Sequence, residues 1–236
     1  MVLRSATLTA VAALSGSCCS AVRRGGAGAA TFAAGVLVGA ATVRFCDSVQ
    51  LYETAADVPG RLIRKQRPFF GEVLSVADGD TLRVRHMPMR LLPRRRFTGK
   101  LSDHTIPVRI IAVDAPEIAH FGAPGQPLAE EARRLASTRV LHRRVRITPM
   151  ATDQYGRIVA RVRYGVFGEL SSEMLRKGLA AVYRGRGASY GHRGQAWWEA
   201  IEARAQREKR GIWSRGAAAT ELPSEYKEAQ KRLKKK

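Results

Sequence analysis

The chain has 236 residues, which is enough for one well-packed domain with extensions but not for two large domains. Lys and Arg number 41 against 20 Asp and Glu, which gives a formal net charge of +21. Such a basic protein is expected to attract polyanions such as nucleic acid or an anionic lipid surface, although charge alone is equally compatible with a solvated basic face. The 3 cysteines, Cys18, Cys19 and Cys46, precede the expected folded domain, which excludes a disulfide framework and a cysteine-based zinc site.

The N-terminal segment is poor in acidic residues and contains a long uncharged run. No acid precedes Asp47, and the leader over residues 1–24 carries Arg and Ser as organelle transit peptides do. The uncharged run over residues 25–43 is bracketed by arginines and is long enough to cross a hydrocarbon core of about 30 Å. It predicts a single-pass anchor in membrane lipid, with the mitochondrion as the expected location. The alternatives are a cleaved targeting sequence and a flexible leader.

Downstream of a polar connector over residues 44–68, apolar runs alternate with turn signals. Strands are expected over 71–77, 81–85 and 105–113, around 145–147 and over 158–162. The Asp78-Gly79 pair between the first two strands is a strong hairpin signal. Helices are expected over 126–139, around 170–175 with a stop at Gly178, and around 197–205.

This order of elements predicts an α+β fold. Five short strands with interspersed helices fit a five-stranded OB-fold-type β-barrel that is decorated with about three helices and preceded by the N-terminal transmembrane or targeting segment. The expected organisation is a leader over 1–24, a transmembrane helix over 25–43, a connector over 44–68, the barrel domain over 69–215 and a basic, disordered tail over 216–236.

Two polar clusters lie at the ends of expected strands. Asp80 follows the predicted turn, where its carboxylate can point into a cleft, although a hairpin without any function is the alternative. Arg109 interrupts an apolar strand, and a guanidinium there needs a carboxylate, a ligand or a water-filled cleft. An internal ion pair without any function is the alternative. Asp114 closes that strand and Glu117 follows a rigid bend, so the two carboxylates can face one site.

The third cluster, Thr-Asp-Gln-Tyr-Gly-Arg over residues 152–157, ends in Arg157 at the start of the next expected strand, and a simple turn is again the alternative. Together the clusters offer the carboxylate oxygens that a hard cation such as calcium prefers. They also offer a carboxylate able to deprotonate water and two guanidinium groups that match phosphate oxygens. This combination suits phosphodiester hydrolysis.

These clusters, in this order, resemble the staphylococcal nuclease-like family. The matching stretches are residues 78–81, Arg109 with 113–117, 153–157, 174–180 (Met-Leu-Arg-Lys-Gly-Leu-Ala) and 209–213 (Lys-Arg-Gly-Ile-Trp). The resemblance covers about residues 69–215 and, as an ordered set of motifs, is highly specific. Residues 118–122 (Ile-Ala-His-Phe-Gly), a long basic loop with Arg94–Arg96 and the N-terminal apolar run look most like the fungal membrane-anchored, mitochondrion-associated endonucleases of this family.

The resemblance implies a role for each site residue. Asp80, Asp114 and the backbone carbonyl of Ala115 would bind calcium, Glu117 would be the general base, Arg109 and Arg157 would hold the phosphate, and Tyr155 would contact the substrate. Two positions depart from the bacterial enzyme. Ala115 replaces a Thr, which is tolerable if only its carbonyl binds metal. Gln154 replaces a substrate-contacting Lys, which leaves the preferred nucleotide or end open.

Three functions stay open on the sequence alone. The leading hypothesis is a calcium-dependent nuclease that acts on DNA, RNA or both. The second is a binding module of the same fold, although such modules lack the catalytic carboxylates and arginines that are all present here. The third is a membrane-tethered scaffold whose basic loop binds lipid or RNA. The sequence indicates no protein partner.

Overall fold

The computed structural model describes residues 50–88, 98–119 and 124–233. The expected transmembrane run over 25–43, the basic loop with Arg94–Arg96, and His120 lie outside these described residues. Within the described part of the chain, no helix is both long and apolar enough to cross a membrane.

The expected β-barrel is present. Its strands are β1 (Phe69–Val76), β2 (Thr81–His86), β3 (Ile106–Ile110), β5 (Arg144–Thr152) and β6 (Ile158–Tyr164), with the short strand β7 (Gly168–Glu169) added beside β6. The sheet runs in the order β3-β2-β1-β5-β6-β7, and the parallel pairing of β3 with β6 closes it. Two further strands, β4 (Val113–Asp114) and β8 (Ala181–Val182), form a separate antiparallel pair. The prediction of an α+β fold with a five-stranded barrel is confirmed.

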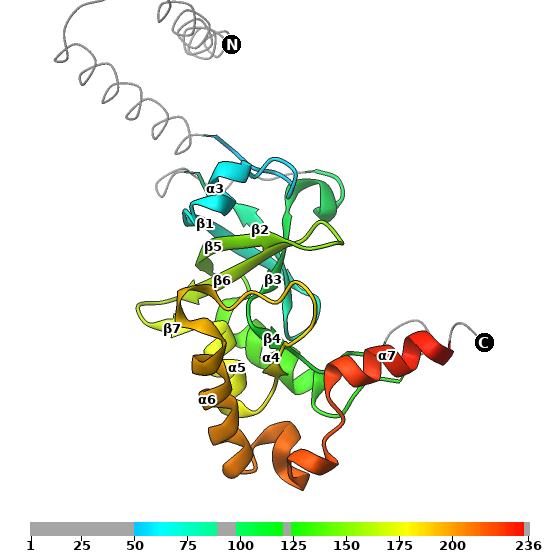
Figure 1. The fold of residues 1–236 in the computed structure, drawn as a ribbon. Coiled ribbons are helices and arrows are strands. Elements are labelled where there is room, and N and C mark those ends of the chain that lie inside the picture. The colour runs from blue at the N-terminus through cyan, green and yellow to red at the C-terminus, as the bar shows by residue number, and fades with distance from the viewer. Residues whose placement is uncertain (1–49, 89–97, 120–123, 234–236) are drawn as a thin grey trace, which may run out of the picture. The chain divides into compact units, whose positions relative to one another are not determined.

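Helices gather at one end of the barrel (Figure 1). They are α4 (Ala129–Val140), α5 (Leu170–Lys177), α6 (Gly194–Arg207) and α7 (Pro223–Leu233), while the short α3 (Gly60–Arg64) lies at the other end. Helix α5 stops at Gly178 as predicted, because this residue adopts a φ of +67° and a Cβ there would lie 2.2 Å from the carbonyl oxygen of Arg210. The expected number of about three helices is exceeded because α3 and α7 form in segments that were expected to be irregular.

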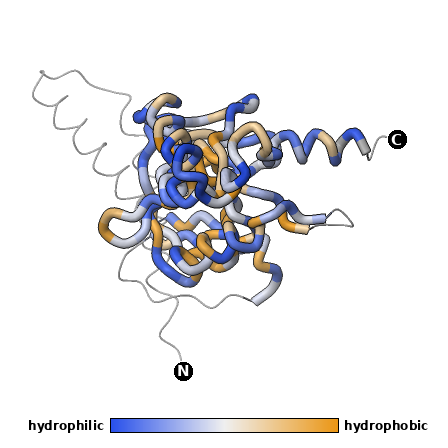
Figure 2. Tube along the Cα trace, turned by 90° about the horizontal axis from the view of Figure 1, so that it is seen from below, coloured by the Kyte–Doolittle hydropathy of each residue, from blue (hydrophilic) through white to orange (hydrophobic). Residues whose placement is uncertain are grey.

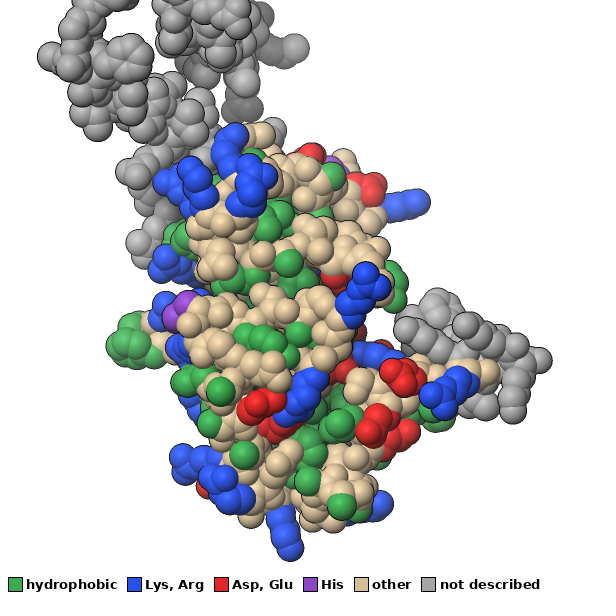
Figure 3. Space-filling model, viewed as in Figure 1, with side chains coloured by type: hydrophobic (Ala, Val, Ile, Leu, Met, Phe, Trp, Pro, Cys, Tyr) green, Lys and Arg blue, Asp and Glu red, His purple; other side chains and the backbone are tan. Residues whose placement is uncertain are grey.

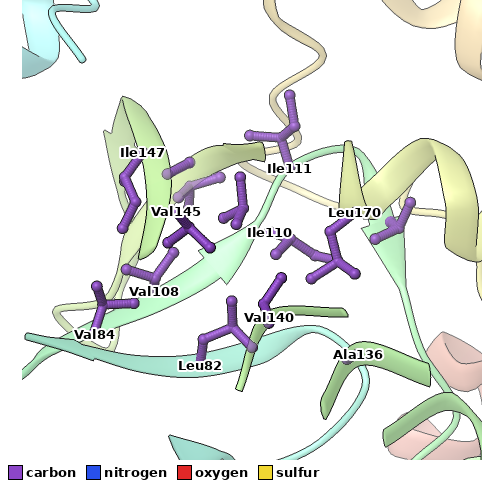
Figure 4. Close-up of a cluster of buried hydrophobic side chains, with 14 of the residues drawn as sticks. Leu82, Val84, Val108, Ile110, Ile111, Ala136, Val140, Val145, Ile147 and Leu170 are labelled. Atoms are coloured by element: carbon purple, nitrogen blue, oxygen red, sulfur yellow. The ribbon is translucent and has the colours of Figure 1, made fainter. Parts of the chain in front are cut away.

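The core is built from alternating strand positions and from one face of α4 and α5. Leu82 and Val84 of β2, Val108 and Ile110 of β3, and Val145 and Ile147 of β5 point inward together (Figure 4). The apolar face of α4 consists of small residues at helical spacing, which allows this helix to approach the barrel closely. The hydrophobic segments therefore concentrate inside the domain, whereas α7 is largely hydrophilic (Figure 2).

The packed unit begins earlier than the sequence indicated. Tyr52, Val58 and Leu62, which belong to the expected polar connector, are buried in the core. Tyr52 stacks on the ring of His86 with a centroid distance of 4.4 Å, and its backbone N–H donates a hydrogen bond to His86 Nδ1. Residues 50–68 therefore contribute side chains to the folded domain.

Candidate active site

Strand pairing brings the first two polar clusters together at one end of the barrel. Thr81, the first residue of β2, pairs with Arg109 of β3. The carbonyl oxygen of Asp80 accepts a hydrogen bond of 2.9 Å from the N–H of Ile110, which fixes the backbone of Asp80 beside β3. Residue 79 must be glycine in this turn, because a Cβ there would lie 2.6 Å from the Cβ of Ala115.

Arg109 is the centre of the buried charge cluster. Its Nη2 lies 2.8 Å from Asp114 Oδ1 and 3.0 Å from Asp80 Oδ2. The side chain of Arg109 is 13% exposed, and those of Asp80 and Asp114 are 3% exposed. Burial disfavours the charged guanidinium, but the two carboxylates outweigh burial and raise the pKa of Arg109 above its usual value. The predicted need of Arg109 for a carboxylate is therefore met by both aspartates.

The two aspartates retain unused acceptor capacity. Asp80 Oδ2 and Asp114 Oδ2 are buried and accept no hydrogen bond from the described residues, even though Arg109 lies close to Asp80 Oδ2. Burial of Asp80 opposes its ionisation, yet the charges of Arg109 and Lys227 keep the pKa of this carboxyl below its usual value. In the described part of the chain, Asp80 Oδ2 has only its ion pair with Arg109, and a hard cation can satisfy buried carboxylate oxygens of this kind.

The predicted metal ligands are all oxygen atoms, which are the ligands that calcium prefers. The described residues contain no group of three or more His, Cys, Asp or Glu side chains arranged to hold a metal ion. The expected ligand set differs from such a group, since it combines the carboxylates of Asp80 and Asp114 with the backbone carbonyl of Ala115. Ala115 is 2% exposed and lies against Gly79, so a small side chain is required here for packing.

Asp78 adds negative charge beside this cluster. Its Oδ1 accepts a hydrogen bond of 3.1 Å from the N–H of Asp80. Burial, followed by repulsion from Asp80 and Glu117, raises the pKa of Asp78 to about 7. The carboxyl groups around Asp80 therefore resist a further negative charge, even though Arg109 and Lys227 lie among them.

Glu117 lies on a loop whose backbone is held by hydrogen bonds to Gln126. Its N–H donates to Gln126 Oε1 at 3.0 Å, and its carbonyl oxygen accepts from the N–H of Gln126 at 2.8 Å. The side chain remains 34% exposed, and its Oε1 lies 2.7 Å from Lys227 Nζ. A positioned and accessible carboxylate of this kind can accept a proton from a water molecule.

The third cluster adjoins the first through a short series of contacts. Arg157 Nε donates to Asp153 Oδ2 at 2.7 Å, and its Nη1 donates to Thr81 Oγ1 at 3.2 Å. The hydroxyl of Thr81 in turn donates to Asp80 Oδ1 at 2.9 Å. Tyr155 is 66% exposed, with its ring centroid 5.4 Å from the Arg157 guanidinium. The structure therefore places Arg157 beside the buried aspartates and Tyr155 on the outer surface.

Two neighbours of the site were not anticipated from the sequence. Tyr183 lies under Arg109, with 5.0 Å between the guanidinium carbon and the ring centroid. Lys227 of α7 lies 2.7 Å from both Asp114 Oδ1 and Glu117 Oε1. The segment before Lys227 does contain a helix-start signal, because Pro223 opens α7 and Glu225 accepts a hydrogen bond from the preceding backbone.

A closed OB-type barrel with buried aspartates, arginines and an accessible glutamate at one end has the groups that chemistry on phosphate esters requires. Comparison with known proteins makes the assignment specific. Residues 107–215 match the family model described as staphylococcal nuclease homologue. The match begins after Asp80 and ends before α7, so it contains Arg109, Asp114, Glu117 and Arg157.

Curated relatives cover most of the chain. This chain is 39% identical over 184 residues to the probable endonuclease LCL3 of Debaryomyces hansenii. The aligned region covers 72% of this chain and 77% of that protein. The chain is 37% identical over 199 residues to endonuclease Htp3 of Saprolegnia parasitica, covering 83% of this chain and 93% of that protein. The probable endonuclease LCL3 of Schizophyllum commune is 41% identical over 187 residues, or 72% of this chain and 63% of that protein. The chain belongs to the staphylococcal nuclease-like family and is a nuclease, as the sequence motifs predicted.

Proposed function

We propose that the protein is a calcium-dependent endonuclease that hydrolyses phosphodiester bonds of DNA, RNA or both at the cluster around Asp80, Arg109 and Asp114. The observation that carries this proposal is the pair of buried carboxylate oxygens, one on each aspartate, that accept no hydrogen bond. Purely structural acids in a protein interior normally have their oxygens satisfied. Glu169 also has one such oxygen, so the support comes from the occurrence of two of them around the single guanidinium of Arg109.

Asp80, Asp114 and the backbone carbonyl of Ala115 would hold calcium, which would supply positive charge beside the phosphate. Glu117 acts as the general base, because it is held by its backbone and accessible through its side chain. It takes the proton from the attacking water, whose oxygen forms a bond to phosphorus as the leaving oxygen departs. Arg109 and Arg157 direct N–H donors toward the phosphate oxygens, and Tyr155 provides an exposed contact for the substrate.

The substrate class follows from charge and from the family. The net charge of +21 favours long polyanions over small phosphate esters, so nucleic acid is the expected substrate. By family resemblance, the products are expected to carry a 3′-phosphate.

Hydrolysis of labelled DNA and RNA by residues 48–236 tests this proposal, with calcium or with excess chelator and with analysis of product ends. We expect calcium-dependent internal cleavage and 3′-phosphate ends. The variant Asp114→Asn serves as the inactive control. Nucleic-acid binding without any cleavage in calcium would instead support the silent binding module.

We also propose that residues 25–43 hold the protein at a membrane as a single-pass anchor, with the mitochondrion as its location. The support is the uncharged length of this run, the arginines at both of its ends and the acid-poor leader before it. Carbonate extraction of isolated organelles, followed by N-terminal sequencing, tests the anchor. Release of a soluble protein whose terminus lies beyond residue 43 would support a cleaved leader and would leave the nuclease assignment intact.

A further inference from the structure

Helix α7 contributes a cation to the nuclease site from outside the family match. The match ends at residue 215, whereas α7 spans Pro223–Leu233. Lys227 of this helix forms ion pairs of 2.7 Å with Asp114 Oδ1 and with Glu117 Oε1. Acidic and basic side chains accordingly gather where α7 meets the domain (Figure 3). The ammonium of Lys227 therefore bridges a predicted metal ligand and the predicted general base.

Several contacts besides the ion pairs hold α7 in this position. The hydroxyl of Tyr226 donates a hydrogen bond to the carbonyl oxygen of Pro124, in the loop that follows Glu117. The hydroxyl of Thr220 donates to the carbonyl oxygen of Ile212 at 2.9 Å, and Leu222 packs against the small cluster around Trp213. The position of Lys227 in the site is therefore fixed by the packing of the C-terminal segment.

Lys227 is an incomplete substitute for a metal ion. It contacts one oxygen of Asp114 and one of Glu117, but Asp80 Oδ2 and Asp114 Oδ2 still accept no hydrogen bond. An ammonium offers three donors and a single charge, whereas calcium carries two charges and takes six to eight oxygen ligands. The side chain of Lys227 is 31% exposed, so water can reach the ion pairs and they can open.

We infer that Lys227 is an internal ammonium that competes with the divalent cation for Asp114 and stays paired with Glu117 until that cation displaces it. This inference rests on the proposed function. Arg109 and Lys227 already share Asp114 Oδ1, so calcium at this carboxylate would add a third positive group. The added repulsion favours release of Lys227, which is the more exposed of the two cations. The displacement frees Glu117 at the same moment, which couples metal binding to activation of the base. By linkage, the docking of α7 must weaken calcium binding by the same factor as calcium weakens the docking of α7.

Calcium affinity measured by titration calorimetry on the full-length chain tests the competition. Lys227→Met removes the ammonium and keeps an unbranched apolar stem, while Arg232→Met removes the same charge from an exposed position of α7. If the docked form predominates about tenfold, Lys227→Met lowers the calcium dissociation constant about tenfold. Arg232→Met is expected to bind calcium as the unchanged chain does. Equal affinities in all three proteins would overturn the inference.

Hydrogen exchange of residues 223–233 supplies a second readout that does not depend on activity. Calcium is expected to accelerate exchange in α7 of the unchanged chain, because Lys227 leaves its carboxylates. Calcium-insensitive exchange in α7 would contradict the inference. So would loss of turnover in Lys227→Met at saturating calcium, since Lys227 would then act in the reaction itself.

The two proposals fail in different ways. Cation binding by the unchanged chain with no effect of Lys227→Met overturns only the role of Lys227. Absence of calcium binding in both proteins overturns the cation site, and the inference built on it falls as well.

Discussion

Two buried acid–arginine clusters of this domain differ in how completely their carboxylates are satisfied. Glu202 of α6 is 3% exposed, like the site aspartates, and both of its oxygens are used. Its Oε1 accepts from the N–H of Val182 at 2.7 Å, and its Oε2 accepts from Arg184 at 2.6 Å. Asp80 and Asp114 are as deeply buried, yet each keeps one oxygen without a hydrogen bond. Burial of charge alone therefore does not distinguish the site cluster from the Glu202 cluster. The site differs in holding two such oxygens around one arginine, whereas Glu169, outside the site, holds a single one.

The two clusters also differ in their consequences for mutation. The Glu202 cluster connects α6 to β8, so its loss is expected to lower stability. The Asp80–Asp114 cluster is arranged for a ligand, so its loss is expected to lower activity.

The largest effect is expected for the catalytic groups. Glu117→Gln and Arg157→Ala should each reduce turnover by a factor on the order of 10²–10⁴, because one removes the base and the other a donor to the developing charge. Both variants should still bind nucleic acid, because the basic surface is retained. Their affinity should fall as the salt concentration rises. Single-turnover rates and binding isotherms check both variants. Glu130→Gln, at an exposed position of α4, is the matched control, and near-normal rates in both site variants would refute their assignment.

Replacement of Glu202 should lower the stability of the domain without lowering its turnover. Glu202→Met keeps the side-chain length but leaves the N–H of Val182 buried without an acceptor. The free energy of unfolding should fall by about 2–4 kcal/mol, while turnover per folded molecule stays unchanged. Denaturant unfolding combined with rate measurements separates the two quantities. A selective loss of turnover would place Glu202 in the functional cluster.

Calcium should stabilise the unchanged protein through its site aspartates. A calcium concentration one hundred times the dissociation constant should raise the free energy of unfolding by about 2.7 kcal/mol. The same concentration should have little effect on Asp80→Asn, which lacks one of the buried carboxylates. Thermal unfolding with and without calcium measures the difference. Equal stabilisation of both proteins would show that calcium binds elsewhere.

The smallest expected effect concerns a fully structural polar group, the imidazole of His86. Burial lowers the pKa of His86 from 6.5 to about 4. The unfolded chain therefore binds a proton at this residue between about pH 6.5 and pH 4 that the folded chain excludes, so stability must fall as the pH is lowered through this window. Between pH 8 and pH 5 the loss should be about 2 kcal/mol.

Comparison of the unchanged domain with His86→Gln tests this pH dependence. The variant lacks a titrating ring and should lose the corresponding part of the pH dependence, even if it is less stable at every pH. Denaturant unfolding at pH 8 and pH 5 provides the measurement. An unchanged pH dependence would assign the acid sensitivity to other groups.

The sequence predicted features that depend on local pattern. The strands alternate in hydrophobicity, the Asp78-Gly79 pair marks a hairpin, and the site residues occur in short ordered motifs, so the barrel and its family could be inferred. The family match and the curated relatives confirm the nuclease assignment, whereas the roles of individual residues stay predictions.

The features that were missed depend on contacts between distant parts of the chain. Tyr52 is buried because it stacks on His86, and the composition of its own segment does not reveal this. Lys227 contacts Asp114 across a separation of 113 residues, so it could not be distinguished from the other lysines of the basic tail. Local periodicity carries no information about such contacts, which arise only when α7 packs against the loop after β4.

The most direct test of the calcium site is the initial rate of hydrolysis as a function of free calcium concentration. The unchanged protein should be inactive in excess chelator, should reach a saturating rate as calcium is added, and should lose that rate again on chelation. Asp80→Asn and Asp114→Asn should require much more calcium or remain inactive, since each removes a carboxylate with an unused buried oxygen. A full rate in excess chelator, or an unchanged calcium dependence in both variants, would contradict the assignment of these oxygens to a catalytic cation.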